Sequence, residues 1–336
     1  MGLFFCARSD WKGRDRLILQ GICAALLAAS LTPLVIVICR RLGIMDIPRD
    51  YRRMHCKSVP RGGGIAVFLS FGTMGLAVCP SSHLFRCALV GGLGLFLLGL
   101  IDDIRCLGPL SKLWVQILLA TGAVLASGMA RGWRFPVAVL WVLLLTNAHN
   151  FIDGMDGLLM GSAAIEGGGI FLVCSLVGLV EVGVAPLLLS GACLGFLCFN
   201  RYPASIFSGD CGSLSVGFLL GFFSLPLLFG LEGRFSVLSP LFLFAYPLTD
   251  LLCAVLRRVL RGKSPFYPDR GHLHHRICDA GISHPLCVGI LHSLAGASAM
   301  IGVLVCQPSS FATAGFFCLL TALLLIRLRF FISQFG

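Results

Sequence analysis

Amide and acidic side chains interrupt an apolar region in the middle of this sequence. Between two long hydrophobic segments stand Asn147, Asn150, Asp153 and Asp156. On an ideal helix, each step of three residues turns the side chain by about 60°, so the first three share one broad face. The glycines that follow Asp153 weaken the helix, so Asp156 can turn back toward the same place. These oxygen ligands predict a site for a hard cation such as Mg²⁺; a polar loop between two spans is the alternative.

Two further acidic motifs lie at the ends of other apolar segments. Asp102 and Asp103 are adjacent, and Asp210 stands in a glycine-framed turn. Neighbouring carboxylates at a membrane surface repel each other, which raises the pKa of one of them unless a cation is shared. The pair is therefore a candidate metal site or general base, and Asp210 is a candidate metal ligand. The alternative for the pair is solvation of a helix end. Ser213 can cap the helix that follows, and the alternative for Asp210 is that it only completes this cap.

A late loop is rich in histidine. It contains Arg270 and three histidines, which are His272, His274 and His275. Zinc would require a closed ligand set, and no cysteine lies at a suitable spacing. Several basic residues lie nearby, so phosphate is the favoured ligand. A basic loop against anionic lipid is the alternative.

An early loop combines basic residues with three glycines. It contains His55 and Arg61, followed by Gly62–Gly64 at the start of an apolar segment. Backbone N–H groups at such a position can bind phosphate. The alternative, which we favour from this segment alone, is a basic loop on the inner side of a membrane followed by a close contact between helices.

The composition identifies the class of protein that carries these motifs. The 336 residues are 57% hydrophobic and 12% charged, whereas a soluble domain has about 25% charged residues. Repeated apolar runs of about 20 residues predict an all-α, polytopic integral membrane protein, and the alternating segments of a barrel are not seen. The net charge of +11 lies mainly beside the spans, which favours anionic lipid over nucleic acid as a partner. The 16 cysteines include no C-x-x-C pair, so neither a disulfide framework nor a zinc site is expected.

We expect one membrane-embedded domain over residues 1–336 with about 11 transmembrane helices. The expected spans are 17–39, 62–79, 87–101, 113–129, 136–150, 158–180, 184–200, 213–230, 237–256, 286–306 and 311–330. An odd number of spans places the two termini on opposite sides. With the N-terminus outside, most Lys and Arg residues fall in inner loops, although the basic tail of residues 1–16 conflicts with this. The expected cytoplasmic loops are 40–61, 102–112, 147–157, 201–212 and 257–285, and they contain every polar motif described above.

The order of these motifs closely resembles the polyprenyl-phosphate N-acetylhexosamine-1-phosphate transferases of glycosyl transferase family 4. The resemblance is carried by the acidic pair at 102–103, NxxNxxDGxDGL from Asn147 to Leu158, FxGDxGS from Phe207 to Ser213, and HxHH from His272 to His275. It implies an inner-membrane enzyme that moves a sugar 1-phosphate from a UDP-sugar to undecaprenyl phosphate and releases UMP, with Mg²⁺ or Mn²⁺. One departure is Cys106, which stands where the acidic motif of the family often has a third carboxylate.

The branch and the chemistry follow from the same resemblance. HxHH and the early PRGGG segment resemble the branch that transfers GlcNAc-1-phosphate and starts cell-envelope polysaccharide synthesis. The UDP-MurNAc-pentapeptide branch is the alternative, and a multi-span transporter is the alternative from another class, although no internal repeat favours it. Direct attack by the lipid phosphate and a double displacement through a carboxylate both stay open. The resemblance is also compatible with a homodimer.

Roles can be assigned to the candidate residues on this basis. The expected metal ligands are Asn150 and Asp210. The expected catalytic carboxylates are Asp102, Asp103, Asp153 and Asp156. The expected substrate-binding residues are His55, Arg61, Asn147, Arg270, His272, His274 and His275.

Overall fold

The computed structural model describes residues 11–46, 58–230, 237–264, 267 and 271–306. Within these residues the chain is a bundle of helices, which confirms the all-α class, and the strands described are the short antiparallel β1 (Met45–Asp46) and β2 (Val59–Pro60). The longer helices are α1 (Trp11–Leu42), α2 (Gly64–Val78), α3 (His83–Arg105), α4 (Pro109–Ser127), α5 (Arg134–Ile152), α6 (Leu158–Leu176), α7 (Val180–Asn200), α8 (Gly209–Phe223), α11 (Ala245–Leu260) and α13 (His284–Leu304). The short helices are α9 (Leu225–Leu228), α10 (Leu238–Leu243) and α12 (Leu273–Asp279).

Seven of the described helices are long and apolar enough to cross a membrane, and α2 and α8 are shorter apolar helices. The first seven expected spans, and the tenth, each coincide with one helix. The span expected at 311–330 lies outside the described residues. The protein is therefore a polytopic α-helical membrane protein.

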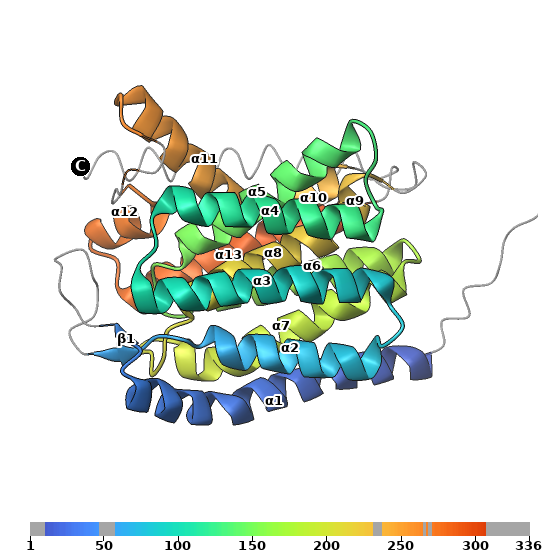
Figure 1. The fold of residues 1–336 in the computed structure, drawn as a ribbon, viewed down its shortest axis with the longest axis horizontal. Coiled ribbons are helices and arrows are strands. Elements are labelled where there is room, and N and C mark those ends of the chain that lie inside the picture. Colours follow the sequence, from blue (N-terminus) through green and yellow to red (C-terminus); the bar gives the residue numbers. More distant parts are fainter. Residues whose placement is uncertain (1–10, 47–57, 231–236, 265–266, 268–270, 307–336) are drawn as a thin grey trace, which may run out of the picture.

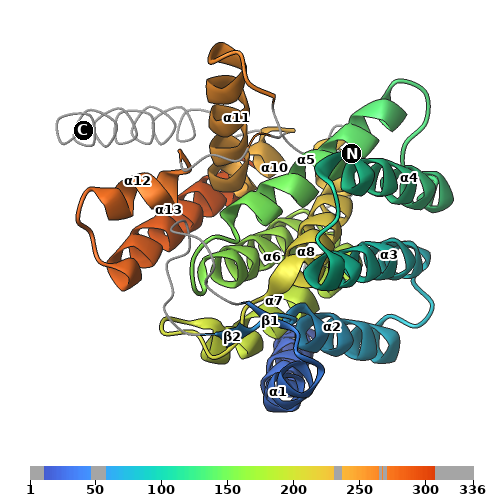
Figure 2. The ribbon, with the colours of Figure 1, turned by 60° about the vertical axis from the view of Figure 1, so that its left-hand side comes forward.

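Two expected spans are each divided into two helices. The range 213–230 contains most of α8 followed by α9, and the range 237–256 contains α10 and most of α11. Proline explains both breaks. Pro226 and Pro247 lie in the first turns of α9 and α11, and a proline ring collides with the carbonyl group of the residue four positions earlier. After the second break, α11 leaves the direction of its neighbours and projects from the bundle (Figure 2).

Helix α8 occupies the centre of the bundle (Figure 2). All of its residues, from Gly209 to Phe223, are buried, and it packs against α2, α3, α5, α6 and α7. The outer helices α3 and α4 instead expose large apolar side chains, among them Val90 (71% exposed) and Trp114 (70% exposed). Such surfaces suit lipid. Helix α8 lies inside this outer layer, so its first turn is held within the molecule and away from lipid.

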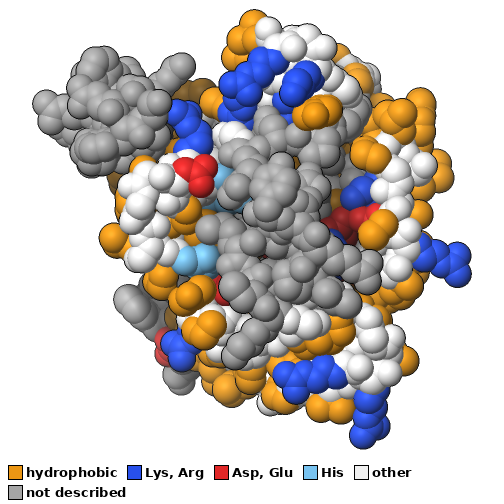
Figure 3. Space-filling model, turned by 90° about the vertical axis from the view of Figure 1, so that its left-hand side faces the viewer, with side chains coloured by type: hydrophobic (Ala, Val, Ile, Leu, Met, Phe, Trp, Pro, Cys, Tyr) orange, Lys and Arg blue, Asp and Glu red, His pale blue; other side chains and the backbone are white. Residues whose placement is uncertain are grey.

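The polar motifs meet at one end of the bundle. Helices α1, α3, α5 and α7 end there, and α2, α4, α6 and α8 begin there (Figure 1). Seen from this end, acidic and basic side chains lie beside each other in a recess, and further Lys and Arg side chains stand around the face (Figure 3). The sequence predicted this gathering from span order and loop charge, and the fold confirms it.

Candidate active site

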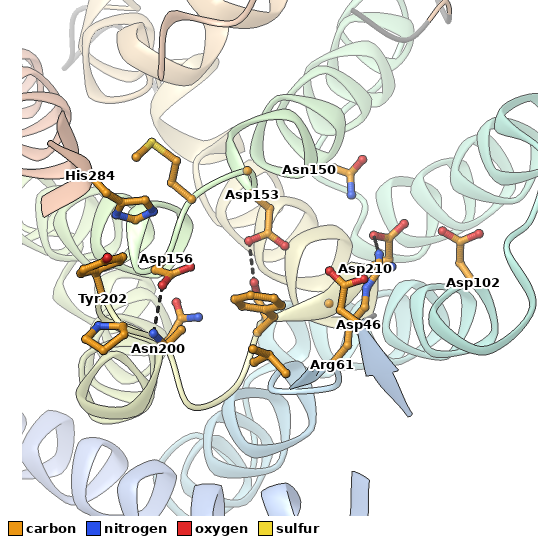
Figure 4. Close-up of a pocket in the computed structure, with 18 of the residues that line it drawn as sticks. Asp46, Arg61, Asp102, Asn150, Asp153, Asp156, Asn200, Tyr202, Asp210 and His284 are labelled. Atoms are coloured by element: carbon orange, nitrogen blue, oxygen red, sulfur yellow. Dashed lines mark hydrogen bonds and ion pairs between the residues drawn. The ribbon is translucent and has the colours of Figure 1, made fainter. Parts of the chain in front are cut away.

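A cavity of about 810 Å³ opens at this end of the bundle. Its volume lies in the usual range for ligand sites. In Figure 4, Tyr202, His284, Asp156 and Asn200 lie toward one side and Asp102, Asp210, Arg61 and Asn150 toward the other, with Asp153 between them. The remaining polar lining side chains are Asp46, Lys112, Ser208 and His275.

Asp210 lies in the first turn of α8 and is held by two cations. Arg61 Nη2 lies 2.7 Å from Asp210 Oδ1, and Lys112 Nζ lies 3.0 Å from Asp210 Oδ2. Burial works against the charged form of Arg61, but the carboxylates of Asp103 and Asp210 outweigh it, and the pKa of the guanidinium is raised. Asp210 therefore forms the centre of a network of opposite charges at the cavity wall.

The adjacent carboxylates of α3 have different surroundings. Asp102 lines the cavity, where its Oδ2 lies 2.8 Å from Lys112 Nζ. The side chain of Asp103 has no exposed surface and does not line the cavity. Its two oxygens accept the backbone N–H groups of Asp210 and Cys211, at 2.8 and 3.1 Å. Asp103 thus caps the N-terminus of α8, where a negative charge is favoured. The prediction treated the pair as one catalytic unit, whereas its members face different surroundings.

Ser213 does not cap the helix, so that part of the alternative is wrong. Helix α8 begins at Gly209, so Ser213 lies inside the helix, where its hydroxyl accepts a hydrogen bond from Asn150 Nδ2 at 2.8 Å. The positive φ of Gly209 (72°) allows the tight entry that brings Asp210 to the first turn.

The three glycines before α2 serve a close backbone contact. The N–H groups of Gly62 and Gly63 donate to Phe207 O, and that of Gly64 donates to Ser208 O at 2.8 Å. These donors are used within the protein, so the favoured alternative, a small-residue contact, describes Gly62–Gly64 better than phosphate binding. The contact places Arg61 beside the first turn of α8.

The C-terminal end of α5 presents two of its three expected residues to the cavity. Asn150 and Asp153 line it, but Asn147 does not. Asn147 Nδ2 instead donates to Gln116 Oε1 of α4 at 2.8 Å. Each step of three residues turns the side chain further around α5, so Asn147 points away from the cavity and toward α4. The expected shared face therefore holds for Asn150 and Asp153 but not for Asn147. Asp156 also lines the cavity, as predicted, because α5 ends at Ile152 and the chain turns back.

Asp153 combines burial with a neutral hydrogen-bond donor. Burial raises the pKa of its carboxyl to about 7, while the hydroxyl of Ser208, which donates to Oδ1, works in the opposite direction. A carboxyl group with this pKa can exchange a proton near neutral pH.

The three histidines of the HxHH motif have three different surroundings. His272 Nδ1 lies 2.8 Å from Asp250 Oδ2, which anchors the start of α12 to α11. His274 is buried against Gly154, and burial, together with the neighbouring His275, lowers the pKa of its ring to about 3. His274 does not line the cavity, and its predicted phosphate contact stays a prediction. Of the three, His275 lines the cavity.

Several lining residues were missed from the sequence. Lys112 forms ion pairs with both Asp102 and Asp210. The sequence feature that could have indicated this role is a single lysine that follows the acidic pair in the same short loop region. Tyr202 and His284 stack with ring centroids 4.6 Å apart. Asn200 joins two loops by accepting from Gly157 N and donating to Ile206 O. The expected roles of His55 and Arg270 concern residues outside those that the structure describes.

The donor set of the cavity fits Mg²⁺. Asp210, Asp102, Asp153 and Asn150 offer hard oxygen ligands to the cavity, and protein sites for Mg²⁺ often use one or two carboxylates together with substrate phosphates. Within the described part of the chain, no group of three His, Cys, Asp or Glu side chains forms a metal site by itself.

Comparison with known proteins defines the class. The chain belongs to glycosyl transferase family 4, whose model matches residues 85–227. A Bacillus subtilis (strain 168) protein named "Probable undecaprenyl-phosphate N-acetylglucosaminyl 1-phosphate transferase" is 31% identical, over 82% of this chain and 81% of its own length. A decaprenyl-phosphate N-acetylglucosaminephosphotransferase from Mycobacterium tuberculosis (strain CDC 1551 / Oshkosh) is 34% identical, over 83% of this chain and 80% of its own. An undecaprenyl-phosphate alpha-N-acetylglucosaminyl 1-phosphate transferase from Escherichia coli (strain K12) is 26% identical, over 80% and 78%.

Proposed function

We propose that this protein transfers GlcNAc-1-phosphate from UDP-GlcNAc to a polyprenyl phosphate, with undecaprenyl phosphate as the first candidate, and releases UMP. The observation that carries the proposal is a single cavity in which carboxylates, an amide and two cations meet at one end of a membrane bundle. The names of the three relatives support the same reaction. The product would start a cell-envelope polysaccharide.

The charged side of the cavity suits the two phosphate groups that must meet. Both reactants are anionic, so their approach requires positive charge. Arg61 and Lys112 now neutralise Asp210, and the same groups can donate to phosphoryl oxygens. Asp210 and Asn150 would hold Mg²⁺ or Mn²⁺, which supplies charge neutralisation on the diphosphate when it is bound.

Asp102 and Asp153 are the carboxylates placed to handle a proton. Asp102 lies on the cavity wall beside Lys112 and would orient the lipid phosphate. Asp153, whose carboxyl pKa is raised to about 7 by burial, would accept a proton from it. Asp103 would act as a positioning residue through α8, because both of its oxygens are already bonded to that helix.

This arrangement bears on the choice between direct attack and double displacement. Of the two adjacent carboxylates, Asp102 is the one that could act as a nucleophile, because the Asp103 side chain is unexposed. Isolation of a labelled phospho-sugar enzyme in the absence of lipid would support the double displacement.

The aromatic side of the cavity suits a nucleotide base. Tyr202 and His284 form a stacked pair at an interplanar angle of 28°, and a planar ring such as uracil gains by packing on such a surface. We place the UDP end of the donor here, with its diphosphate directed past Asp153 toward Asp210.

The deciding experiment uses purified protein with undecaprenyl phosphate and a panel of UDP-sugars. UMP release with UDP-GlcNAc supports the proposal. Release only with UDP-MurNAc-pentapeptide would move the protein to the other branch, and no release with any sugar would contradict the function.

We also propose that the cavity opens at the cytoplasmic face of the inner membrane. Single cysteines introduced in 102–112 and 201–212, in a variant depleted of native cysteines, should react with an impermeant reagent only from that face. Labelling of the two loops from opposite faces would contradict a shared active site.

A further inference from the structure

A pair of buried ionisable residues lies behind the cavity and is not used in the mechanism above. His149 of α5 and Glu166 of α6 are both fully buried, and His149 Nε2 lies 2.6 Å from Glu166 Oε2. We propose that this pair is a positioning device, which sets the place of α5 against α6 and α8 and thereby the place of Asn150 and Asp153 in the active site. The inference rests on the proposed function for its kinetic test.

Both ring nitrogens of His149 take part in hydrogen bonds. Nδ1 lies 2.7 Å from the carbonyl oxygen of Leu145. A carbonyl oxygen can only accept, so Nδ1 carries a hydrogen. One further proton lies between Nε2 and the Glu166 carboxyl group, as an ion pair or as a neutral hydrogen-bonded pair. In either form the contact fixes the His149 ring in direction and in distance from α6.

Stability does not account for these residue types. Glu166 Oε1 is buried and has no hydrogen-bond partner among the residues that the structure describes, and the same holds for the hydroxyl of Ser162 one turn earlier on α6. A buried polar atom without a partner destabilises a fold. Replacing a whole buried ion pair by apolar side chains is often neutral or stabilising. Residues that are costly for folding are best explained by what they position.

His149 lies where several helices meet. A Cβ atom on Gly217 of α8 would lie 2.9 Å from His149 Cβ, so the two helices are in close contact here. The His149 ring also packs edge-on against Phe244, at the break between α10 and α11, with centroids 6.1 Å apart. A side chain held from three directions cannot slide along the bundle without disturbing its neighbours.

The functional residues of α5 follow directly after this junction. Asn150 is the next residue and donates to Ser213 of α8, and Asp153, about one turn further on, accepts from Ser208. Because a helix is stiff, a shift of α5 at His149 is passed to both. Misplacing an active-site group by about 1 Å can lower the rate by about 100-fold.

The test compares four forms of the full-length protein in detergent. In Glu166→Leu the ring nitrogen loses its partner, so the melting temperature should fall. In the double variant His149→Leu/Glu166→Leu both polar groups are gone, so the melting temperature should equal or exceed that of the wild type, while kcat falls by about 10- to 100-fold. Glu166→Gln can still donate to Nε2 and should retain most of the wild-type kcat.

A second buried polar contact, made by α5 with the C-terminal end of α8, provides the control. Trp141 Nε1 of α5 donates to the hydroxyl of Ser224, at the far end of α8, at 2.9 Å. The double variant Trp141→Phe/Ser224→Ala removes this contact far from the cavity and should leave kcat unchanged. Loss of activity in both double variants to the same extent would mean that any buried polar contact has this effect, and would overturn the proposal.

A binding measurement tests the role of the His149–Glu166 pair independently of the proposed transfer activity. Mn²⁺ affinity, followed by the electron paramagnetic resonance signal of free Mn²⁺, should be weaker in the double variant than in the wild type. Equal affinity together with equal kcat would overturn the positioning role. If the wild type transfers no sugar phosphate, the proposed function fails. Equal Mn²⁺ affinity of the wild type and the double variant would then still overturn the positioning role of the pair.

Gly217→Ala provides a second route if the double variant does not fold. Its new methyl group would press on α5 at His149 while leaving the pair intact. It should lower kcat and weaken Mn²⁺ binding in the same direction, and wild-type values for both would overturn the proposal.

Discussion

Replacing Gly99 of α3 with alanine should damage the active site without touching an active-site side chain. A Cβ atom at this position would lie 2.3 Å from Asp210 O and 2.4 Å from Cys211 N. An ordinary contact begins at about 3.4 Å, so the backbones of α3 and α8 must separate by about 1 Å. Both contacted atoms belong to the backbone of a fully buried helix, which has no flexible side chain that could move aside.

The size of the effect follows from that separation. Overpacking of this kind lowers the free energy of unfolding by about 1–3 kcal/mol. The same shift draws the carboxylate of Asp103 away from the N–H groups of α8 and moves Asp210 away from Lys112. A displacement of about 1 Å can lower the rate by about 100-fold. We therefore expect kcat to fall by about 100-fold, and the melting temperature to fall only moderately.

The assay is UMP release at saturating UDP-GlcNAc and lipid, alongside thermal unfolding in detergent. Gly122→Ala on α4 is the matched control, because within the described part of the chain a Cβ atom there meets nothing within 4 Å. Gly94→Ala on α3 is a milder control, because the nearest atoms to its Cβ belong to the side chain of Leu119, which can move aside. Wild-type kcat in a folded Gly99→Ala protein would refute the reasoning that the α3–α8 contact places Asp210.

Four further predictions address the cavity itself. Asp210→Asn should lower transfer by about 100-fold or more while the protein still inserts into membranes; retained UMP release would remove Asp210 from the metal site. EDTA should stop the reaction and Mg²⁺ or Mn²⁺ should restore it, whereas full activity in EDTA would count against a metal. Activity should rise as the pH passes through about 7, because the carboxyl group of Asp153 loses its proton there. Ser208→Ala removes a hydrogen bond that favours the charged carboxylate, so the pKa of Asp153 should rise. The rise in activity should then occur at higher pH. An unchanged pH profile would exclude Asp153 as the group that titrates. Tyr202→Leu removes the stack on His284 and should raise the KM for UDP-GlcNAc by about 2- to 10-fold with little change in kcat; an unchanged KM would place the base elsewhere.

The adjacent residues Asp102 and Asp103 illustrate the limit of prediction from sequence. Consecutive positions on a helix differ by about 100° in direction, so one side chain can face a cavity while its neighbour faces a packed helix. Which of the two faces the cavity depends on how α3 is rotated against α8, and that rotation is set by the glycine contact at Gly99. The sequence shows this glycine but does not say which helix packs against it.

Lys112 and the histidine motif show the same limit. A single lysine at the start of a span has the ordinary meaning of a charge at a membrane surface, yet here it joins Asp102 to Asp210. The three histidines are close in sequence, but His272 faces Asp250, His274 lies buried behind Gly154, and His275 faces the cavity.

Some properties of this protein are determined by sequence alone. The apolar runs predict the membrane class and the helix order, because a chain in lipid must satisfy its backbone within each span. The motif order identifies the family, and the span order predicts that the acidic, amide and imidazole groups share one end of the bundle. The tertiary structure decides which of these groups reach the cavity and which hold the helices in place. Rotation, depth and close approach of helices arise from packing between segments far apart in the chain, and no local pattern of residues encodes them.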